Sequence, residues 1–170
     1  MQNKLPSSLY VILFVVLLIA NISVYKIIFL PHVLTVSVLE VGKGRAVLVK
    51  SPNNKTVLVD TGPDASILRA LGENLPMWQR KIDVVILTSP AARFAGGLPS
   101  VQSRYSISKI VRIGDRTTPY GSSFVFGNSR IEILAPSSFA ISYGVSVIEI
   151  SSSTPAGVYI SDGTTILRPF

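Results

Sequence analysis

Hydrophobic and polar positions form one long apolar run at the start of the chain. SLYVILFVVLLIANISVY, residues 8–25, contains no charged side chain, and Lys26 interrupts the apolar pattern only shortly before IIFLP. A helix over residues 9–30 would be roughly 33 Å long at 1.5 Å per residue, enough to cross the hydrocarbon core of a bilayer. The ammonium of Lys26 can extend to the interface. The pattern predicts a short tail, residues 1–8, followed by a transmembrane anchor over residues 9–30.

A cleaved signal peptide is the alternative for this run. The anchor is favoured because the apolar stretch is long for a signal peptide and no clear small-x-small cleavage site follows it. Only Lys4 and the α-amine precede the run, and Lys26 and His32 follow it, so positive charge does not decide the orientation. We therefore expect a single-pass protein of the cell membrane.

From Val33 the pattern changes to short β-rich runs separated by turn residues. LTVSVLEV, RAVLVK and TVLVD predict three strands, and SPNNK between the last two predicts a hairpin turn. The apolar residues of DASILRALGENL recur at helical spacing, which predicts a helix with Asp64 as N-cap that ends before Pro76. IDVVIL is fully apolar and predicts a buried central strand.

The remainder continues with a short predicted helix over residues 98–105 and a series of short strands. The strand predictions are KIVRIG, SSFVFG, RIEIL, VSVIEIS, GVYIS and TTILR. Strands with inserted helices indicate a layered α/β (α+β) domain over residues 33–170.

Two stretches carry a family resemblance: the glycine loop EVGKGRA, residues 40–46, and TSPAARFAGGL, residues 88–98. In order and spacing, Leu34 to Leu98 resembles the metallo-β-lactamase superfamily, with a weaker match onward to Asp162. More narrowly, it resembles the extracytoplasmic domain of the DNA-internalisation channel of natural competence, in which a membrane span also precedes LTVSVL. The resemblance implies an αββα sandwich with metals at one edge of the two sheets. We expect an incomplete sandwich, because the family's later elements would lie beyond Phe170.

The metal ligands that the resemblance implies are substituted. Hydrolytic members carry Thr-His-x-His-x-Asp-His-x-Gly-Gly, whereas this chain has Ser89, Ala91 and Phe94 at the histidine positions and Arg93 at the aspartate position. The later Thr-Gly-Asp stretch, which supplies a bridging carboxylate, survives at best as Ser161-Asp162. The resemblance therefore implies a degenerate site.

Composition supports the same conclusion without the family. A binuclear zinc site needs several imidazoles, yet the chain has one histidine, His32, and no cysteine. Asp60 and Asp162 could in principle hold a hard cation such as magnesium, but strand-end aspartates more often accept backbone hydrogen bonds in turns. Ser89 has no histidine available as a base. We expect no catalytic residue, no metal and no cofactor, and hence no enzyme.

The charge balance points to binding. Sixteen basic residues against nine acidic ones give a net charge of +7, and Lys43, Arg45 and Arg93 fall on the two loops that the resemblance places at one edge. Such cations can replace the positive charge of a metal without activating water. We expect them to bind an anion such as nucleic acid, although three long side chains on loops can also simply face solvent.

Other functions stay open at this point. A scaffold protein could pair through an exposed sheet edge with itself, as a homo-oligomer, or with a membrane channel protein. A metal-dependent hydrolase and a decaying fragment are less favoured. The family's arrangement places the domain outside the cytoplasm.

Overall fold

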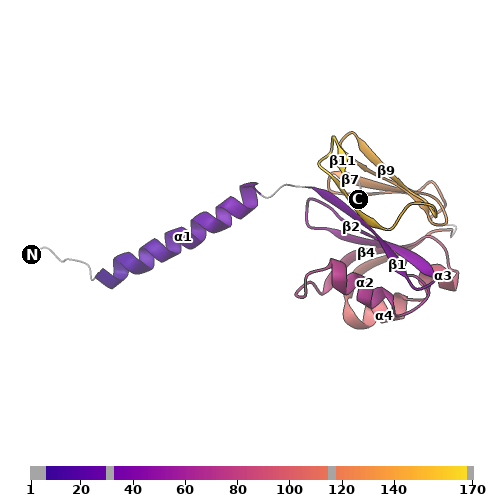
Figure 1. The fold of residues 1–170 in the computed structure, drawn as a ribbon, viewed down its shortest axis with the longest axis horizontal. Coiled ribbons are helices and arrows are strands. Elements are labelled where there is room, and N and C mark those ends of the chain that lie inside the picture. Colours follow the sequence, from indigo (N-terminus) through magenta and orange to yellow (C-terminus); the bar gives the residue numbers. More distant parts are fainter. Residues whose placement is uncertain (1–6, 30–32, 115–117, 168–170) are drawn as a thin grey trace, which may run out of the picture. The chain divides into compact units, whose positions relative to one another are not determined.

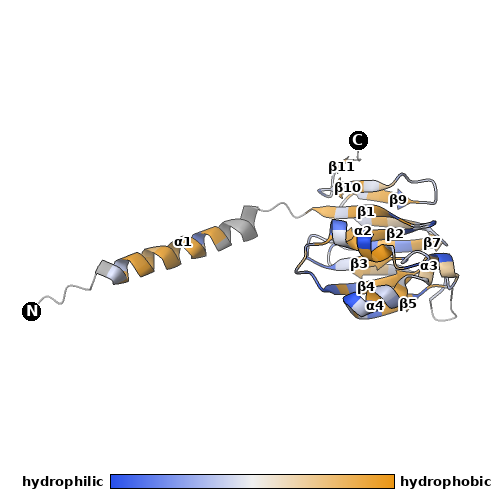
Figure 2. Ribbon diagram, turned by 60° about the horizontal axis from the view of Figure 1, so that its bottom comes forward, coloured by the Kyte–Doolittle hydropathy of each residue, from blue (hydrophilic) through white to orange (hydrophobic). Residues whose placement is uncertain are grey.

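A computed structural model describes residues 7–29, 33–114 and 118–167, and the chain divides into two compact units, residues 1–32 and 33–170. The first unit contains helix α1 (Ser7–Phe29), whose large apolar side chains from Leu9 to Ile22 are 45–65% exposed. Figure 2 shows that most of its described length is hydrophobic. Among the described helices, none is both long enough and apolar enough to cross a membrane. The transmembrane anchor predicted over residues 9–30 is thus unsupported by the structure.

The second unit is built on a seven-stranded sheet with the strand order β11-β10-β1-β2-β3-β4-β5 (Figure 1). Its strands are β1 (Leu34–Val41), β2 (Gly44–Lys50), β3 (Thr56–Val59), β4 (Lys81–Leu87), β5 (Ser106–Arg112), β10 (Gly157–Ser161) and β11 (Ile166–Leu167). Strands β3, β4 and β5 are parallel to one another, and the other pairs are antiparallel. The predicted hairpin joins β2 to β3, and Asn54 in its turn has a φ of 57°.

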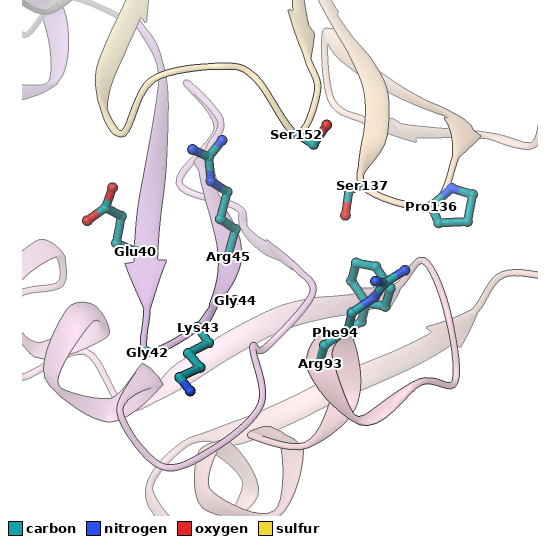
Figure 3. Close-up of a pocket in the computed structure, with 10 residues that line it drawn as sticks. All are labelled: Glu40, Gly42, Lys43, Gly44, Arg45, Arg93, Phe94, Pro136, Ser137 and Ser152. Carbon is teal, nitrogen blue, oxygen red and sulfur yellow. The ribbon is translucent and has the colours of Figure 1, made fainter.

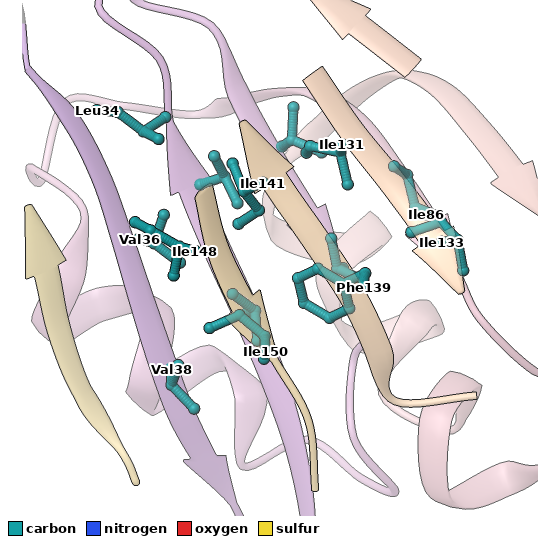
Figure 4. Close-up of a cluster of buried hydrophobic side chains, with 14 of the residues drawn as sticks. Leu34, Val36, Val38, Ile86, Ile131, Ile133, Phe139, Ile141, Ile148 and Ile150 are labelled. Atoms are coloured by element: carbon teal, nitrogen blue, oxygen red, sulfur yellow. The ribbon is translucent and has the colours of Figure 1, made fainter. Parts of the chain in front are cut away.

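A second, four-stranded antiparallel sheet packs on the first. It has the order β6-β7-β8-β9, with β6 (Ser123–Phe126), β7 (Ser129–Ala135), β8 (Ser138–Tyr143) and β9 (Ser146–Ile150). Alternate residues of each strand point inward, and Figure 4 shows Ile131, Ile141 and Ile148 meeting Leu34 and Val36 of β1. This alternation buries one apolar face of each sheet in a common core.

Helices cover the other face of the seven-stranded sheet. They are α2 (Ile67–Asn74), α3 (Ala92–Ala95) and α4 (Leu98–Arg104), which lie below the sheet in Figure 1. Ile67 and Leu71 of α2 and Val101 of α4 pack on Leu48 and Leu58 to form a second core. Within the described residues no helix covers the outer face of the four-stranded sheet. The domain thus has a helix layer and two sheets, three of the four layers of the expected αββα sandwich.

The start of α2 differs from the prediction. The helix begins at Ile67, and Ser66 occupies the N-cap position without a side-chain capping bond. Asp64, the predicted N-cap, instead accepts hydrogen bonds from the Ser66 N–H at 2.9 Å and the Ser66 hydroxyl at 2.5 Å. This Asx turn satisfies Asp64 locally, so the helix starts later than its sequence pattern indicates.

The loops of this domain lie at two opposite edges of the sandwich, one at each end of the strands. The β1–β2 turn and the ends of β3 and β4 share one edge, and Lys50, Lys55 and Lys81 share the other. Both hydrophobic cores consist only of residues from Leu34 onward. The segment 33–170 therefore contains a complete core of its own and is expected to fold without residues 1–32.

Candidate anion-binding site

A pocket of about 710 Å³ opens at the edge formed by the β1–β2 turn and the loop after β4. We call it the cationic pocket; it is lined by Glu40, Gly42, Lys43, Gly44, Arg45, Arg93, Phe94, Pro136, Ser137 and Ser152. Figure 3 shows Arg45 extending towards Ser152, with Arg93 on the other side of the pocket beside Phe94. The three cations identified from the sequence thus line one pocket.

Glycine allows the two cationic loops to approach each other. Gly42 has a φ of 59°, a left-handed conformation that the tight β1–β2 turn requires. At Gly44 an added Cβ would lie 2.7 Å from Cδ of Pro63 and 2.9 Å from the carbonyl oxygen of Arg93. A side chain at Gly44 would push the Arg93 backbone away, so this glycine keeps the two walls of the pocket together.

Contacts orient two of the three cations. The guanidinium of the half-buried Arg45 donates a hydrogen bond of 2.5 Å to the carbonyl oxygen of Thr154. The guanidinium carbon of Arg93 lies 4.6 Å from the ring centroid of Phe94, a cation–π contact. A guanidinium has five N–H donors, so both groups keep donors for an incoming oxyanion. Arg45 and Arg93 are therefore partly preorganised.

One carboxylate also lines the cationic pocket. Glu40 stands opposite Arg45 in the β1–β2 register and is exposed. Three cations and this carboxylate leave an excess of two positive charges among the lining residues. That excess favours an anion with more than one charge over a neutral ligand.

Asp60 does not line the cationic pocket, and both oxygens of its carboxyl accept hydrogen bonds from Thr88. The carboxyl of Asp60 is 4% exposed, and it accepts hydrogen bonds from the N–H and the hydroxyl of Thr88, both at 2.8 Å. Burial raises the pKa of Asp60 to about 6, while the two Thr88 hydrogen bonds oppose the rise. The N–H of Ser137 donates to the Thr88 hydroxyl at 3.3 Å. Asp60 thus ties the ends of β3 and β4 to the β7–β8 turn.

Asp162, the other predicted carboxylate, lies at the opposite edge. Ser161 pairs with Leu34 at the start of β1, because β10 runs antiparallel to β1. Asp162 is exposed and accepts hydrogen bonds from the N–H groups and hydroxyls of Thr164 and Thr165, and the backbone bonds hold its pKa well below the usual range. Asp60 and Asp162 are not brought together, so the structure provides no shared cation site for them.

Residues at the positions where the sequence resemblance implies metal ligands have local structural roles. The Ser89 hydroxyl accepts a hydrogen bond from the Ala91 N–H at 3.3 Å, and Ala91 precedes α3. The Phe94 side chain is buried, and only Arg93 and Phe94 of these four residues line the cationic pocket. Across the described residues, no group of three or more His, Cys, Asp or Glu side chains could hold a metal ion. His32 lies outside the described residues.

Sequence reasoning missed the walls of the pocket that come from the second sheet. Pro136 and Ser137 belong to the β7–β8 turn, and Ser152 belongs to the β9–β10 connection. The Pro-Ser-Ser stretch at 136–138 signals a turn, but no local pattern places that turn beside Arg93.

Comparison with known proteins gives structural matches alone, since no family model and no curated protein matches the chain. A metallo-β-lactamase of Cronobacter sakazakii with a HARLDQ motif aligns at 14% identity and a TM-score of 0.44, covering 58% of this chain and 48% of that one. The subclass B3 metallo-β-lactamase MEM-A1 from a soil metagenome library aligns at 11% identity and a TM-score of 0.46, covering 68% and 58%. A diphosphatase from the PhnP family aligns at 17% identity and a TM-score of 0.42, covering 69% and 60%.

The chain thus spans about half to three-fifths of these solved structures. With TM-scores below 0.5, we assign no residue of this chain from the alignments. The mixed α/β architecture with two packed sheets is consistent with the metallo-β-lactamase-like fold that the sequence resemblance implies.

Proposed function

We propose that residues 33–170 form a non-catalytic binding domain that holds a phosphate-containing polyanion in the cationic pocket. The observation that carries the proposal is that Lys43, Arg45 and Arg93, from two separate loops, line one pocket, although Figure 3 shows Lys43 extending away from the two arginines. Charge-assisted hydrogen bonds from arginine suit phosphate oxygens, which accept two parallel N–H bonds from one guanidinium. The ligand stays intact, because the pocket offers cations where a hydrolase would offer a metal-bound water.

Nucleic acid is the polyanion we propose. The support is the resemblance of Leu34 to Leu98 to the DNA-internalisation channel of natural competence, together with the net charge of +7. A pocket with an excess of two charges matches two or three consecutive phosphates of a single strand. We infer a role in holding DNA during an uptake-like process.

The test is fluorescence anisotropy of a labelled single-stranded DNA titrated with the segment 33–170. We expect Lys43→Glu, Arg45→Glu and Arg93→Glu each to weaken binding by about tenfold, the lower end of what a charged hydrogen bond contributes. Lys109→Glu is the matched control, since Lys109 is an exposed cation on β5 that does not line the pocket. If all four variants lose affinity for DNA equally, the net charge of the domain and not the pocket determines binding. If the three pocket variants keep their affinity, the proposed site is wrong.

Membrane association through α1 is a further part of the proposal, with the domain outside the cytoplasm as in the family that the sequence resembles. The support is the exposure of the large apolar side chains from Leu9 to Ile22, because a helix that is apolar on all sides needs an apolar environment. Flotation of the full chain with vesicles, and the loss of flotation when residues 1–30 are removed at high salt, would support it. A full chain that stays at the bottom of the gradient would contradict it.

The scaffold alternative gains no support from the β5 edge of the seven-stranded sheet. Strand β5 ends one side of the seven-stranded sheet, and it exposes Lys109 and Arg112. Charged side chains on an edge strand oppose pairing with another strand.

A further inference from the structure

The edge opposite the cationic pocket carries the three most exposed apolar side chains of the described part of residues 33–170. Met77 is 87% exposed, Trp78 is 84% exposed and Val145 is 82% exposed. Single exposed apolar residues are common on protein surfaces, whereas these three large side chains share one edge of the domain. We call this surface the Trp78 edge and define it by these three residues and the cations around them.

Strand connections bring these three residues to one edge although they come from different layers. Met77 and Trp78 lie between α2 and β4, just before Lys81 begins that strand. Val145 lies in the β8–β9 turn, and its N–H donates to the carbonyl oxygen of Gly163 at 2.8 Å. Gly163 follows β10, whose Ser161 pairs with Leu34 at the start of β1. The Trp78 edge is therefore also the edge at which the chain enters the domain after residues 1–32.

Cations lie beside Trp78. Lys50, Lys55, Trp78 and Lys81 line a groove of about 650 Å³ at this edge. The N–H of Ser106 donates to the carbonyl oxygen of Arg80 at 2.8 Å, which brings the end of α4 to the same edge. The cations of the Trp78 edge are Lys50, Lys55, Arg80, Lys81 and Arg104.

Fewer carboxylates share the edge. Asp83 lies 3.5 Å from the ammonium of Lys55 and 3.7 Å from that of Lys81; its side chain is half-buried, whereas both lysine side chains are exposed. Asp162 follows β10, and Glu73 is paired with Arg69 at 3.8 Å. The five cations and the two carboxylates of Asp83 and Asp162 give the Trp78 edge an excess of about three positive charges.

We propose that the Trp78 edge docks on the surface of an anionic lipid bilayer. Trp78, Met77 and Val145 enter the boundary between headgroups and acyl chains, where tryptophan is favoured, and the five cations contact the lipid phosphates. Nucleic acid fits the edge less well, because methionine and valine offer no aromatic face on which a base can stack. The helix that precedes this edge in the chain, α1, exposes apolar side chains from Leu9 to Ile22.

Docking in this way sets the direction of the cationic pocket. Strand β1 runs from the Trp78 edge to the β1–β2 turn, and its eight residues span roughly 26 Å at 3.3 Å per residue. The pocket then opens away from the bilayer, towards the solvent from which a polyanion would arrive. This consequence does not depend on the identity of the pocket's ligand.

Trp78 is the chain's single tryptophan, so its fluorescence reports on the proposed contact directly. The segment 33–170 is mixed with vesicles of phosphatidylcholine alone or with a third of phosphatidylglycerol, with and without bromine-labelled acyl chains. We expect a blue shift of the emission and quenching by bromine in the anionic vesicles, and a loss of both above about 0.5 M salt. Emission that is unchanged by anionic vesicles at low salt overturns the proposal.

Variants separate insertion from charge. Met77→Ser with Val145→Ser keeps Trp78 and should weaken vesicle binding at least tenfold, and Lys55→Glu with Arg80→Glu should do the same. Arg130→Glu, on the outer face of the four-stranded sheet, is the control and should change binding less than twofold. Lys43→Glu with Arg45→Glu should weaken DNA binding about a hundredfold but preserve the blue shift, which separates this proposal from the pocket. If single-stranded DNA quenches Trp78 and competes with the vesicles at the same variants, the edge is a nucleic-acid site and the lipid proposal is wrong.

Discussion

Thr88 holds both oxygens of the buried Asp60 carboxyl, with its N–H on Oδ1 and its hydroxyl on Oδ2, each at 2.8 Å. Asp60 follows β3 and Thr88 follows β4, so these bonds join two parallel strands at the edge that carries the cationic pocket. Asp60 also adopts a φ of 58°, which asparagine tolerates nearly as well. The residue is therefore a structural tie within the pocket edge.

Replacing Asp60 by Asn should remove a pH dependence of stability. Burial raises the pKa of Asp60 to about 6 from 3.8, so between these values the folded chain holds a proton that the unfolded chain has lost. The contribution of Asp60 to the free energy of unfolding is therefore largest below about pH 4. It decreases by on the order of 3 kcal/mol as the pH rises to about 6. Urea unfolding at pH 4.5 and pH 7 should show this fall in the parent and a smaller one in Asp60→Asn. Equal pH dependence in both proteins would contradict the assignment.

Gly97→Ala should destabilise the domain, because two loops touch at this glycine. A Cβ there would overlap the carbonyl oxygen of Thr61 and lie 2.7 Å from that of Asp64. Overpacking against backbone costs about 1–3 kcal/mol. Gly72→Ala in α2 is the matched control: its Cβ meets nothing within 4 Å, so alanine should stabilise the helix by about 0.5–1 kcal/mol. The Tm of both variants, measured by thermal unfolding, tests this prediction. An unchanged Tm in Gly97→Ala would contradict the close approach of the two loops.

Contacts within the domain explain the turn that residues 88–98 form. Thr88 bonds Asp60, and the pair Gly96-Gly97 allows the loop to pack on Thr61 and Pro63. These demands come from the backbone and are independent of metal ligands. The turn therefore does not require metal ligands at Ser89, Ala91, Arg93 and Phe94, the positions where the sequence resemblance implies them.

Hydrophobic periodicity predicted the strands from β1 to β7 and from β9 to β11 and the helices α2 and α4, because their apolar faces are continuous and their turns carry Gly, Pro or Asn. The predicted strand KIVRIG begins three residues later than β5 does. The periodicity missed β8, where the small residues Ala140 and Ser142 alternate with Phe139 and Ile141, and it missed the short helix α3. Periodicity also cannot state which strand lies beside which. The pairing of β10 with β1 joins strands that are far apart in the sequence, so local patterns do not predict it. This pairing places Asp162 at the opposite edge from Asp60.

The salt dependence of DNA binding should reveal how many cations of the pocket contact phosphates. Each neutralised phosphate of a single strand adds about −0.7 to the slope of log K against log salt, so three contacts predict a slope of about −2. Lys43→Ala or Arg93→Ala should each reduce the steepness by about 0.7, and Lys109→Ala should leave it unchanged. Dissociation constants at several salt concentrations between 50 and 200 mM give these slopes. Slopes that do not respond to Lys43→Ala and Arg93→Ala would show that these cations face solvent.

Zinc should leave the stability of residues 33–170 unchanged. A metal that binds only the folded state stabilises it by about 2.7 kcal/mol at a hundred times its dissociation constant, a shift of several degrees in Tm. Such binding needs several nitrogen, sulfur or oxygen ligands on one centre, and the described residues contain no group of three or more His, Cys, Asp or Glu side chains that could supply them. The Asp60 oxygens are occupied by Thr88, and Asp162 lies at the other edge. Tm measured with zinc, with magnesium and with a chelator should agree within about 1 °C, and DNA should remain uncleaved in all three. A metal-dependent rise in Tm or cleavage of the DNA would show that the pocket keeps the chemistry of a hydrolase.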